Sequence, residues 1–253
     1  MTVPPASSAS GSRPLLLITG GAGRIGTAVR PLLRDRYRLR LVTHSKPAEP
    51  AADDELVQAD IQDLPRMLEV TAGAHAVLHL AANASMRTPW NVVRDANIDG
   101  TFNVFEAARL AGVRKLVFAS TNHVTGMYER DGLPVAPEMV VRPDSLYGVS
   151  KAFGEALGRF YVDEYGMSVI CVRIGSFQPH PRNPRMLATW LSPRDFAQLV
   201  WRGIESDVPF GVFYGISGNT RRYWDISNAQ SLLGYAPEDD AEEFAAELLA
   251  TPS

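Results

Sequence analysis

The stretch PLLLITGGAGRIG, residues 14–26, decides the fold. Its first six residues form a short apolar run that predicts a buried strand. Gly20, Gly23 and Gly26 follow with the glycine spacing of a turn that binds a dinucleotide. In such a turn the first glycine permits a sharp bend, the second lets a pyrophosphate approach the backbone, and the third lets the next helix pack closely. That helix offers free N–H groups and a favourable dipole to the phosphates.

Outward from this turn, short apolar runs alternate with helix-like segments. Further strands are predicted at 38–43, 55–60, 76–82, 115–120 and 168–174, with helices at 24–36, about 89–111 and 144–165. This alternation predicts an α/β fold of the Rossmann type, built on a doubly wound parallel sheet. We assign residues 14–177 to this NAD(P)-binding domain, which carries the candidate catalytic residues.

The remainder of the chain, residues 178–253, changes in character. After a proline-broken loop, a helix is predicted at 192–205, with Ser192 as N-cap and Pro193 in its first turn. A short strand at 212–217 and a terminal helix at 238–250 follow. We expect this region to form a small substrate-binding lid that is too small to be stable alone.

Composition and charge narrow the function classes. The net charge of the 253 residues is -3 and there is no basic block, which argues against nucleic acid as a partner. No apolar run approaches membrane-spanning length. Cys171 is the only cysteine, and the histidines lack metal-ligand spacing, so we expect neither an intrachain disulfide nor a metal site. Residues 1–13 read as a disordered leader without the features of a secretion signal, and a cytoplasmic location follows by default.

The end of the second predicted strand bears on the choice of cofactor. An acidic residue at this place would bind the adenosine ribose of NAD. Residues 43–46 offer hydroxyls and a cation instead, which suits the 2′-phosphate of NADP somewhat better. A solvated loop that ignores the ribose is the alternative, so NAD and NADP both stay open. Asp60, after the third predicted strand, is expected near the adenine edge.

A tyrosine and a lysine stand four residues apart in SLYGVSK, residues 145–151. Residues at this spacing share one face of a helix. Tyr147 and Lys151 are therefore either a catalytic pair or two ordinary residues on a helix surface, and the spacing alone leaves both readings open.

Four motifs, in order, resemble the extended short-chain dehydrogenase/reductase superfamily. They are the glycine turn, HLAA (79–82), FASTNHVTG (118–126) and YGVSK (147–151), and the resemblance extends from about residue 14 to 235. It implies that Tyr147 and Lys151 are catalytic and that Thr121 is the catalytic Ser/Thr after the fifth strand. It also implies a homo-oligomer.

Within that superfamily, longer stretches resemble the bacterial uronate dehydrogenases. These stretches are RPDSLYGVSKAFGE (142–155), VRIGSFQPHPRNPRMLATWLSPRDF (172–196) and YWD (223–225). That family oxidises the anomeric carbon of glucuronic or galacturonic acid to an aldarolactone, using NAD. The substrate contacts implied by the resemblance are Ser85, Thr121, Asn122, His123, Tyr147, Ser176 and Arg185, with Arg185 as the partner of the substrate carboxylate.

Two departures from that family matter. The family carries an acidic residue at the end of the second strand, which this sequence lacks, and the segment 81–86 is one residue longer, which bears on Ser85. The expected cofactor contacts are Gly20, Gly23, Arg24, Ile25, Gly26, Thr43, Ser45, Asp60, Ile61, Leu80, Ala81, Ala82, Tyr147 and Lys151.

The predicted chemistry is general base catalysis. A free phenol is a poor base at neutral pH. We expect the Lys151 ammonium to lower the pKa of Tyr147, which then takes the hydroxyl proton of the substrate while Thr121 positions the reacting oxygen. The cofactor accepts the hydride.

Two other classes of function remain open from the sequence. One is a nucleotide-sugar epimerase or dehydratase, or another sugar dehydrogenase of the same superfamily, although the short C-terminal region counts against an enzyme that binds a nucleotide diphosphate sugar. The other is a non-catalytic NAD(P)-sensing protein, against which the Tyr147–Lys151 pair counts.

Overall fold

The computed structural model describes residues 13–45 and 49–250. The predicted leader at 1–12 and Lys46 lie outside the described residues. Arg13, the last residue of the predicted leader, is described, and its guanidinium donates a hydrogen bond to the backbone carbonyl of Arg34.

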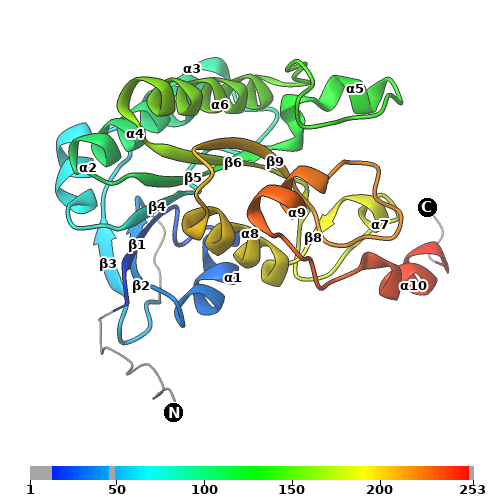
Figure 1. The fold of residues 1–253 in the computed structure, drawn as a ribbon. Helices are drawn as coiled ribbons and strands as arrows, with labels where there is room; N and C mark the ends of the chain where they lie inside the picture. The colour runs from blue at the N-terminus through cyan, green and yellow to red at the C-terminus, as the bar shows by residue number, and fades with distance from the viewer. Residues whose placement is uncertain (1–12, 46–48, 251–253) are drawn as a thin grey trace, which may run out of the picture.

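A parallel sheet of seven strands forms the middle layer of the molecule (Figure 1). The strands are β1 (Leu15–Thr19), β2 (Arg38–Thr43), β3 (Glu55–Gln58), β4 (Ala76–His79), β5 (Lys115–Thr121), β6 (Ser168–Ile174) and β9 (Phe210–Gly215). Their order is β3-β2-β1-β4-β5-β6-β9, so the direction of winding reverses between β1 and β4. Open α/β sheets bind ligands outside the carboxyl ends of the strands at such a reversal. The predicted Rossmann-type sheet is confirmed.

Helices cover both faces of the sheet (Figure 1). One face carries α2 (Leu64–Thr71), α3 (Trp90–Val93), the π-helical turn η1 (Arg94–Asp99), α4 (Gly100–Leu110) and α6 (Leu146–Tyr165). The other carries α1 (Arg24–Leu33), α8 (Pro193–Glu205) and α9 (Ser227–Leu233). The predicted helix at about 89–111 is the continuous run of α3, η1 and α4.

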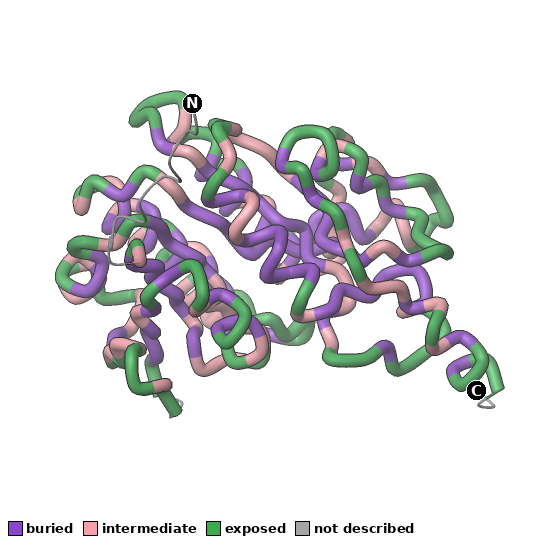
Figure 2. Tube along the Cα trace, turned by 60° about the horizontal axis from the view of Figure 1, so that its bottom comes forward, coloured by how far each residue is buried: buried purple, intermediate pink, exposed green. Residues whose placement is uncertain are grey.

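Alternation along the strands fills two cores. Leu16 and Ile18 of β1 pack in the core toward α1 and α8, whereas Leu17 between them packs in the core toward α4 and α6. Successive strand side chains point to opposite faces, and a strand covered on both faces is apolar throughout. In Figure 2 the buried residues run through the centre of the molecule, and the exposed residues lie along the outer helices and loops.

The seventh strand changes the predicted division of the chain. β9, which we placed in the lid, pairs in parallel with β6, from Val169 beside Phe210 to Ile174 beside Gly215. The sheet therefore extends beyond residue 177 and takes its edge strand from the C-terminal region. A strand this short gives no periodicity that would assign it to one sheet or another.

The segment after β9 also fixes the loop that follows β6. Gly175 N–H donates to Gly215 O at 2.9 Å, and Ser217 N–H donates to Trp190 O at 2.8 Å. Both ends of the loop at 176–189 are thus held by the carboxyl end of β9. That loop carries β7 (Ser176–Phe177) and α7 (Met186–Thr189), and β8 (Trp190–Leu191) pairs with β7.

The C-terminal helices follow the sequence signals in part. The predicted helix at 192–205 is α8, and its N-cap is Ser192, whose side chain accepts a hydrogen bond from the Asp195 amide at 3.0 Å. In place of one helix at 238–250, the chain forms the 3₁₀ turn η3 (Ala241–Phe244) and α10 (Ala245–Ala250). Within the described part of the chain, the helices are too short or too polar to cross a membrane.

Candidate active site

The glycine turn brings two strand ends together. Gly20 has a φ of +71°, a left-handed conformation that favours glycine, and a Cβ added there would lie 2.9 Å from the Ala81 amide nitrogen. A Cβ on Gly26 would lie 2.7 Å from the carbonyl oxygens of Gly20 and Gly21. The turn after β1 therefore packs against the segment after β4, and α1 packs against the turn. α1 starts at Arg24 without a side-chain cap, which leaves its first N–H groups for an acceptor such as a phosphate.

A cavity of about 430 Å³ opens beside this turn, at the carboxyl ends of β1 to β4. The predicted cofactor residues that line it are Gly20, Gly23, Thr43, Ser45, Asp60, Ile61, Leu80, Ala81 and Ala82. The predicted contacts Arg24, Ile25 and Gly26 belong to the first turn of α1, outside this lining. Gln62 and Asn83 also line the cavity and were not predicted, and His44 lines it as part of the predicted segment 43–46. Its place at the sheet reversal and the close glycine packing fit a dinucleotide.

At the ribose end of this cavity, the end of β2 lacks the acidic residue that would bind the adenosine ribose of NAD. Thr43 is buried at the end of β2, and His44 Nε2 lies 3.4 Å from Asp60 Oδ2. Across the described positions 43–45 the lining has hydroxyl and imidazole groups and no carboxylate. Asp60 provides the acidic group of this region, one strand further along the sheet.

The first two turns of α6 hold the tyrosine and the lysine. Ser145 caps this helix by accepting a hydrogen bond from the Gly148 amide at 3.1 Å. Lys151 is 2 % exposed, and its Nζ lies 4.7 Å from the centre of the Phe118 ring on β5 and 5.9 Å from the centre of the Tyr147 ring. Thr121, at the carboxyl end of β5, shares a hydrogen bond with Tyr147. The structure thus brings the three predicted catalytic residues together, and the lysine is not on the helix surface.

Burial controls the protonation of this pair. It raises the pKa of Tyr147 to about 12, and the Thr121 hydrogen bond and the Arg24 charge offset the rise only in part. Burial lowers the pKa of Lys151 to about 7. The expected lowering of the Tyr147 pKa by Lys151 is not observed in this structure: the charge that lowers this pKa is that of Arg24, and burial outweighs it.

Asn97 is a site residue that the sequence analysis missed. It lies in the π-helical turn η1 and is 1 % exposed. Its Oδ1 accepts from the Asn83 amide at 2.8 Å, and its Nδ2 donates to Asn83 O and to Ser150 Oγ, both at 3.0 Å. It therefore joins the wall of the cofactor cavity to the helix that carries Tyr147 and Lys151. Single π-helical turns inside helices often occur at functional sites, but the sequence does not reveal them.

A buried ion pair anchors α6 to the sheet. Arg173 of β6 donates to both oxygens of Glu155 on α6, at 2.9 and 2.8 Å, and both side chains are almost fully buried. Ser120 Oγ donates to Glu155 Oε1 at 2.6 Å. Since Ser120 precedes Thr121, this contact fixes the strand end and the catalytic helix relative to each other.

A second cavity, of about 370 Å³, begins next to Thr121. Its lining consists of Met86, Asn122, His123, Gly126, Glu129, Arg130, Asp144 and Arg185. Asn122, His123 and Arg185 are predicted substrate contacts. The predicted contacts Ser85, Thr121, Tyr147 and Ser176 lie outside this lining, which includes Met86, the neighbour of Ser85. Glu129, Arg130 and Asp144 were not predicted.

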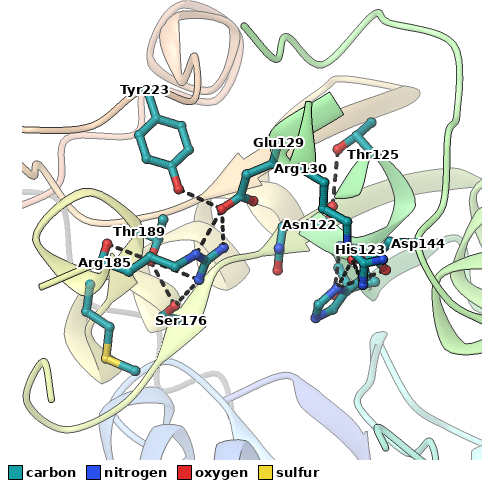
Figure 3. A network of polar contacts seen from close by, with 12 residues as sticks. Asn122, His123, Thr125, Glu129, Arg130, Asp144, Ser176, Arg185, Thr189 and Tyr223 are labelled. Atoms are coloured by element: carbon teal, nitrogen blue, oxygen red, sulfur yellow. Dashed lines mark hydrogen bonds and ion pairs between the residues drawn. The ribbon is translucent and has the colours of Figure 1, made fainter. Parts of the chain in front are cut away.

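Polar contacts fix two of the predicted substrate residues (Figure 3). His123 Nδ1 lies 2.9 Å from Asp144 Oδ2, so the carboxylate orients the imidazole. Arg185 Nη1 donates to Ser176 Oγ at 3.3 Å, which makes Ser176 a support for the guanidinium. The Nε and Nη2 atoms of Arg185 donate to Glu129 Oε1, at 2.8 and 2.6 Å.

Comparisons with known proteins agree with this arrangement. The family model described as the NAD dependent epimerase/dehydratase family matches residues 16–204. The chain is 40 % identical to an NAD-dependent glucose-6-phosphate dehydrogenase of Haloferax volcanii, over 92 % of this chain and 96 % of that one. It is 40 % identical to a uronate dehydrogenase of Pseudomonas syringae pv. tomato, over 94 % of this chain and 86 % of that one.

A solved structure extends the similarity to three dimensions. A variant of the uronate dehydrogenase of Agrobacterium tumefaciens, in complex with NAD, matches with a TM-score of 0.87 and 37 % identity, over 96 % of this chain and 92 % of that one. The family match spans β1 to β6 of the sheet, the glycine turn and the Tyr147–Lys151 helix, and ends before β9. The predicted superfamily is confirmed, and the chain belongs to the NAD dependent epimerase/dehydratase family.

Proposed function

We propose that this chain is an NAD(P)-dependent dehydrogenase that oxidises a uronic acid, glucuronate or galacturonate, at the anomeric carbon to an aldarolactone. The observation that carries the proposal is the place of Arg185. Its guanidinium lines the same cavity as Asn122 and His123, which follow Thr121 directly. A planar guanidinium is well suited to a carboxylate.

The chain's own residues would divide the chemistry as follows. Tyr147 takes the proton of the anomeric hydroxyl, and Thr121 holds that oxygen through its side chain. Lys151, in its ammonium form, stabilises the phenolate. A bound nicotinamide dinucleotide supplies the acceptor for the hydride that leaves the anomeric carbon. Gly20, Gly23 and the first turn of α1 would hold its phosphates, with Thr43, Ser45 and Asp60 toward the adenosine.

Of the predicted lid at 178–253, residues 178–192 keep the proposed role in substrate binding, because Arg185 lies there, whereas α8 and α9 cover a face of the sheet. A cytoplasmic location and a homo-oligomer stay predictions.

A sugar phosphate is the second candidate substrate. Arg130 lines the same cavity as Arg185, and two guanidinium groups suit a phosphate dianion. The identity to a glucose-6-phosphate dehydrogenase supports this alternative.

A substrate panel distinguishes the candidates. Reduced-nicotinamide absorbance is followed with glucuronate, galacturonate, glucose and glucose 6-phosphate, each with NAD and with NADP. The proposal expects the highest kcat/KM with a uronate. A higher value with glucose 6-phosphate would favour the second candidate, and no turnover with any sugar would favour a non-catalytic NAD(P)-sensing protein.

Arg185→Met tests the carboxylate contact. The substitution keeps much of the side-chain length and removes the charge. A charge-assisted hydrogen bond contributes about 1.5–3 kcal/mol, so kcat/KM for glucuronate should fall about 10- to 150-fold. The weak activity on glucose should hardly change. If both activities fall together, Arg185 has a structural role and the uronate assignment loses its main chemical support.

A further inference from the structure

We assign the Arg185 guanidinium to the substrate carboxylate, but in this structure it already pairs with a carboxylate of the chain itself. Two N–H groups of Arg185 donate to Glu129 Oε1, at 2.8 and 2.6 Å. The Tyr223 hydroxyl donates to the same oxygen at 2.8 Å. A single glutamate oxygen thus accepts three hydrogen bonds at the wall of the candidate substrate cavity (Figure 3).

The arginine and the glutamate are held differently. The remaining arm of the guanidinium, Nη1, donates to Ser176 Oγ at 3.3 Å and to Thr189 Oγ1 at 3.5 Å, so the lid loop fixes Arg185 from behind. Glu129 comes from another segment, the five-residue helix α5 (Gly126–Arg130). Its second oxygen, Oε2, accepts no hydrogen bond from any residue in 13–45 or 49–250. Glu129 is therefore the partner that can move away while Arg185 stays in place.

We propose that Glu129 is an internal counter-ion of Arg185, which the substrate carboxylate displaces on binding, and that this exchange selects acidic over neutral sugars. The inference rests on the proposed function. The Nε–Nη2 edge of a guanidinium matches one carboxylate, and a second carboxylate beside it would meet a like charge. A uronate must therefore take the place of Glu129.

Exposure makes this exchange feasible. The Arg185 side chain is 48 % exposed and that of Glu129 is 22 % exposed. Ion pairs with such access to water contribute little to stability, so their replacement by an external carboxylate has a small free-energy cost. A neutral sugar has no charge with which to compete, and Glu129 then stays on Arg185.

Glu129→Gln tests the exchange, because it removes the charge and keeps the shape. KM for glucuronate should fall about two- to five-fold, with kcat within about two-fold, whereas KM for glucose should change less than about two-fold. Tyr223→Phe removes one bond that holds Glu129 and should shift KM for glucuronate in the same direction by a smaller factor. Glu69→Gln is the matched control, since Glu69 pairs with Arg66 at 2.6 Å on the distant helix α2.

Two kinds of result would overturn the proposal. An unchanged or higher KM for glucuronate in Glu129→Gln would show that Glu129 does not compete. An equal fall of KM for glucuronate and glucose would indicate that the substitution acts through the shape of the cavity and not through the lost charge of Glu129. Calorimetric binding of glucuronate to both proteins gives the same comparison without turnover.

The wild-type protein reports separately on the proposed function. Uronate turnover by the wild type, with an unchanged KM in Glu129→Gln, would sustain the function and overturn the counter-ion. A wild type without uronate activity and a Glu129→Gln variant that gains it would support the counter-ion and contradict the uronate as natural substrate. If neither protein binds or oxidises a uronate, both proposals fail.

Discussion

The Lys151 Nζ atom lies 5.9 Å from the centre of the Tyr147 ring, one helical turn along α6. Burial moves the two pKa values apart, to about 7 for Lys151 and about 12 for Tyr147. Between these values the pair consists of a neutral amine and a neutral phenol. That state holds as many protons as an ammonium beside a phenolate, so a proton shift from Tyr147 to Lys151 produces the base.

The pair therefore predicts how activity depends on pH. Below about pH 7 both groups are protonated, and the pair holds one proton too many for base catalysis. We expect kcat/KM for sugar oxidation to rise about ten-fold per pH unit toward pH 7 and then to level off. His79 and Cys171 face Lys151, but burial lowers the pKa of His79 and raises that of Cys171, so both stay neutral in this range.

Initial rates between pH 5.5 and 9 check this expectation. His123→Asn is the control, because it removes the half-buried imidazole ring that lies 6.1 Å from the Tyr147 ring and should leave the midpoint in place. A flat profile, or a midpoint that disappears in His123→Asn, would assign the proton to another group.

Tyr147→Phe removes the proposed base and little volume. Turnover should fall at least about 100-fold, which is the scale of general base catalysis. The thermal midpoint should stay close to that of the wild type. Tyr165→Phe, at the exposed end of the same helix, is the matched control. Near-normal turnover in a folded Tyr147→Phe protein would refute the role of this phenol.

Asn97→Ala should affect stability and turnover together. The substitution leaves the backbone N–H and C=O of Asn83 and the Ser150 hydroxyl without the partner they have now. An unsatisfied buried polar group costs about 1–3 kcal/mol of unfolding free energy. Urea unfolding and kcat should both decline, whereas the exposed Asn91→Ala should change neither. A lower stability with an unchanged kcat would limit Asn97 to a structural role.

Thr43→Asp tests cofactor choice. No carboxylate stands at positions 43–45, so we predict measurable activity of the wild type with NADP. An aspartate at the end of β2 should repel the 2′-phosphate and shift the ratio of kcat/KM values toward NAD. Thr43→Ser, which keeps the hydroxyl, should leave the ratio unchanged. Strict use of NAD by the wild type would contradict this interpretation of the ribose pocket.

Local signals predicted the elements whose causes are local. The glycine turn, the alternation of strands and helices, and the Ser192 cap each depend on neighbouring residues, and the structure shows each of them. The motif resemblance identified Tyr147, Lys151 and Thr121, which the structure brings together.

Contacts between distant segments could not be predicted in this way. β9 joins the sheet because it fits beside β6, and its own six residues do not specify that partner. Glu129 meets Arg185 across 56 positions of sequence, and Asn97 meets Ser150 across 53. The pKa values of Tyr147 and Lys151 depend on how much water the packed site admits, which no spacing of residues expresses.

The anchoring of the loop at 176–189 by the end of β9 has a consequence for protein engineering. One end of this loop is fixed by a backbone bond from Gly175 to Gly215 of β9, and the other by a backbone bond from Ser217, just after β9, to Trp190. The entropic cost of closing a loop grows only slowly with its length. A loop of different length or sequence, taken from a relative with another substrate, can therefore be grafted between these two points, and the cofactor half of the molecule would keep its geometry.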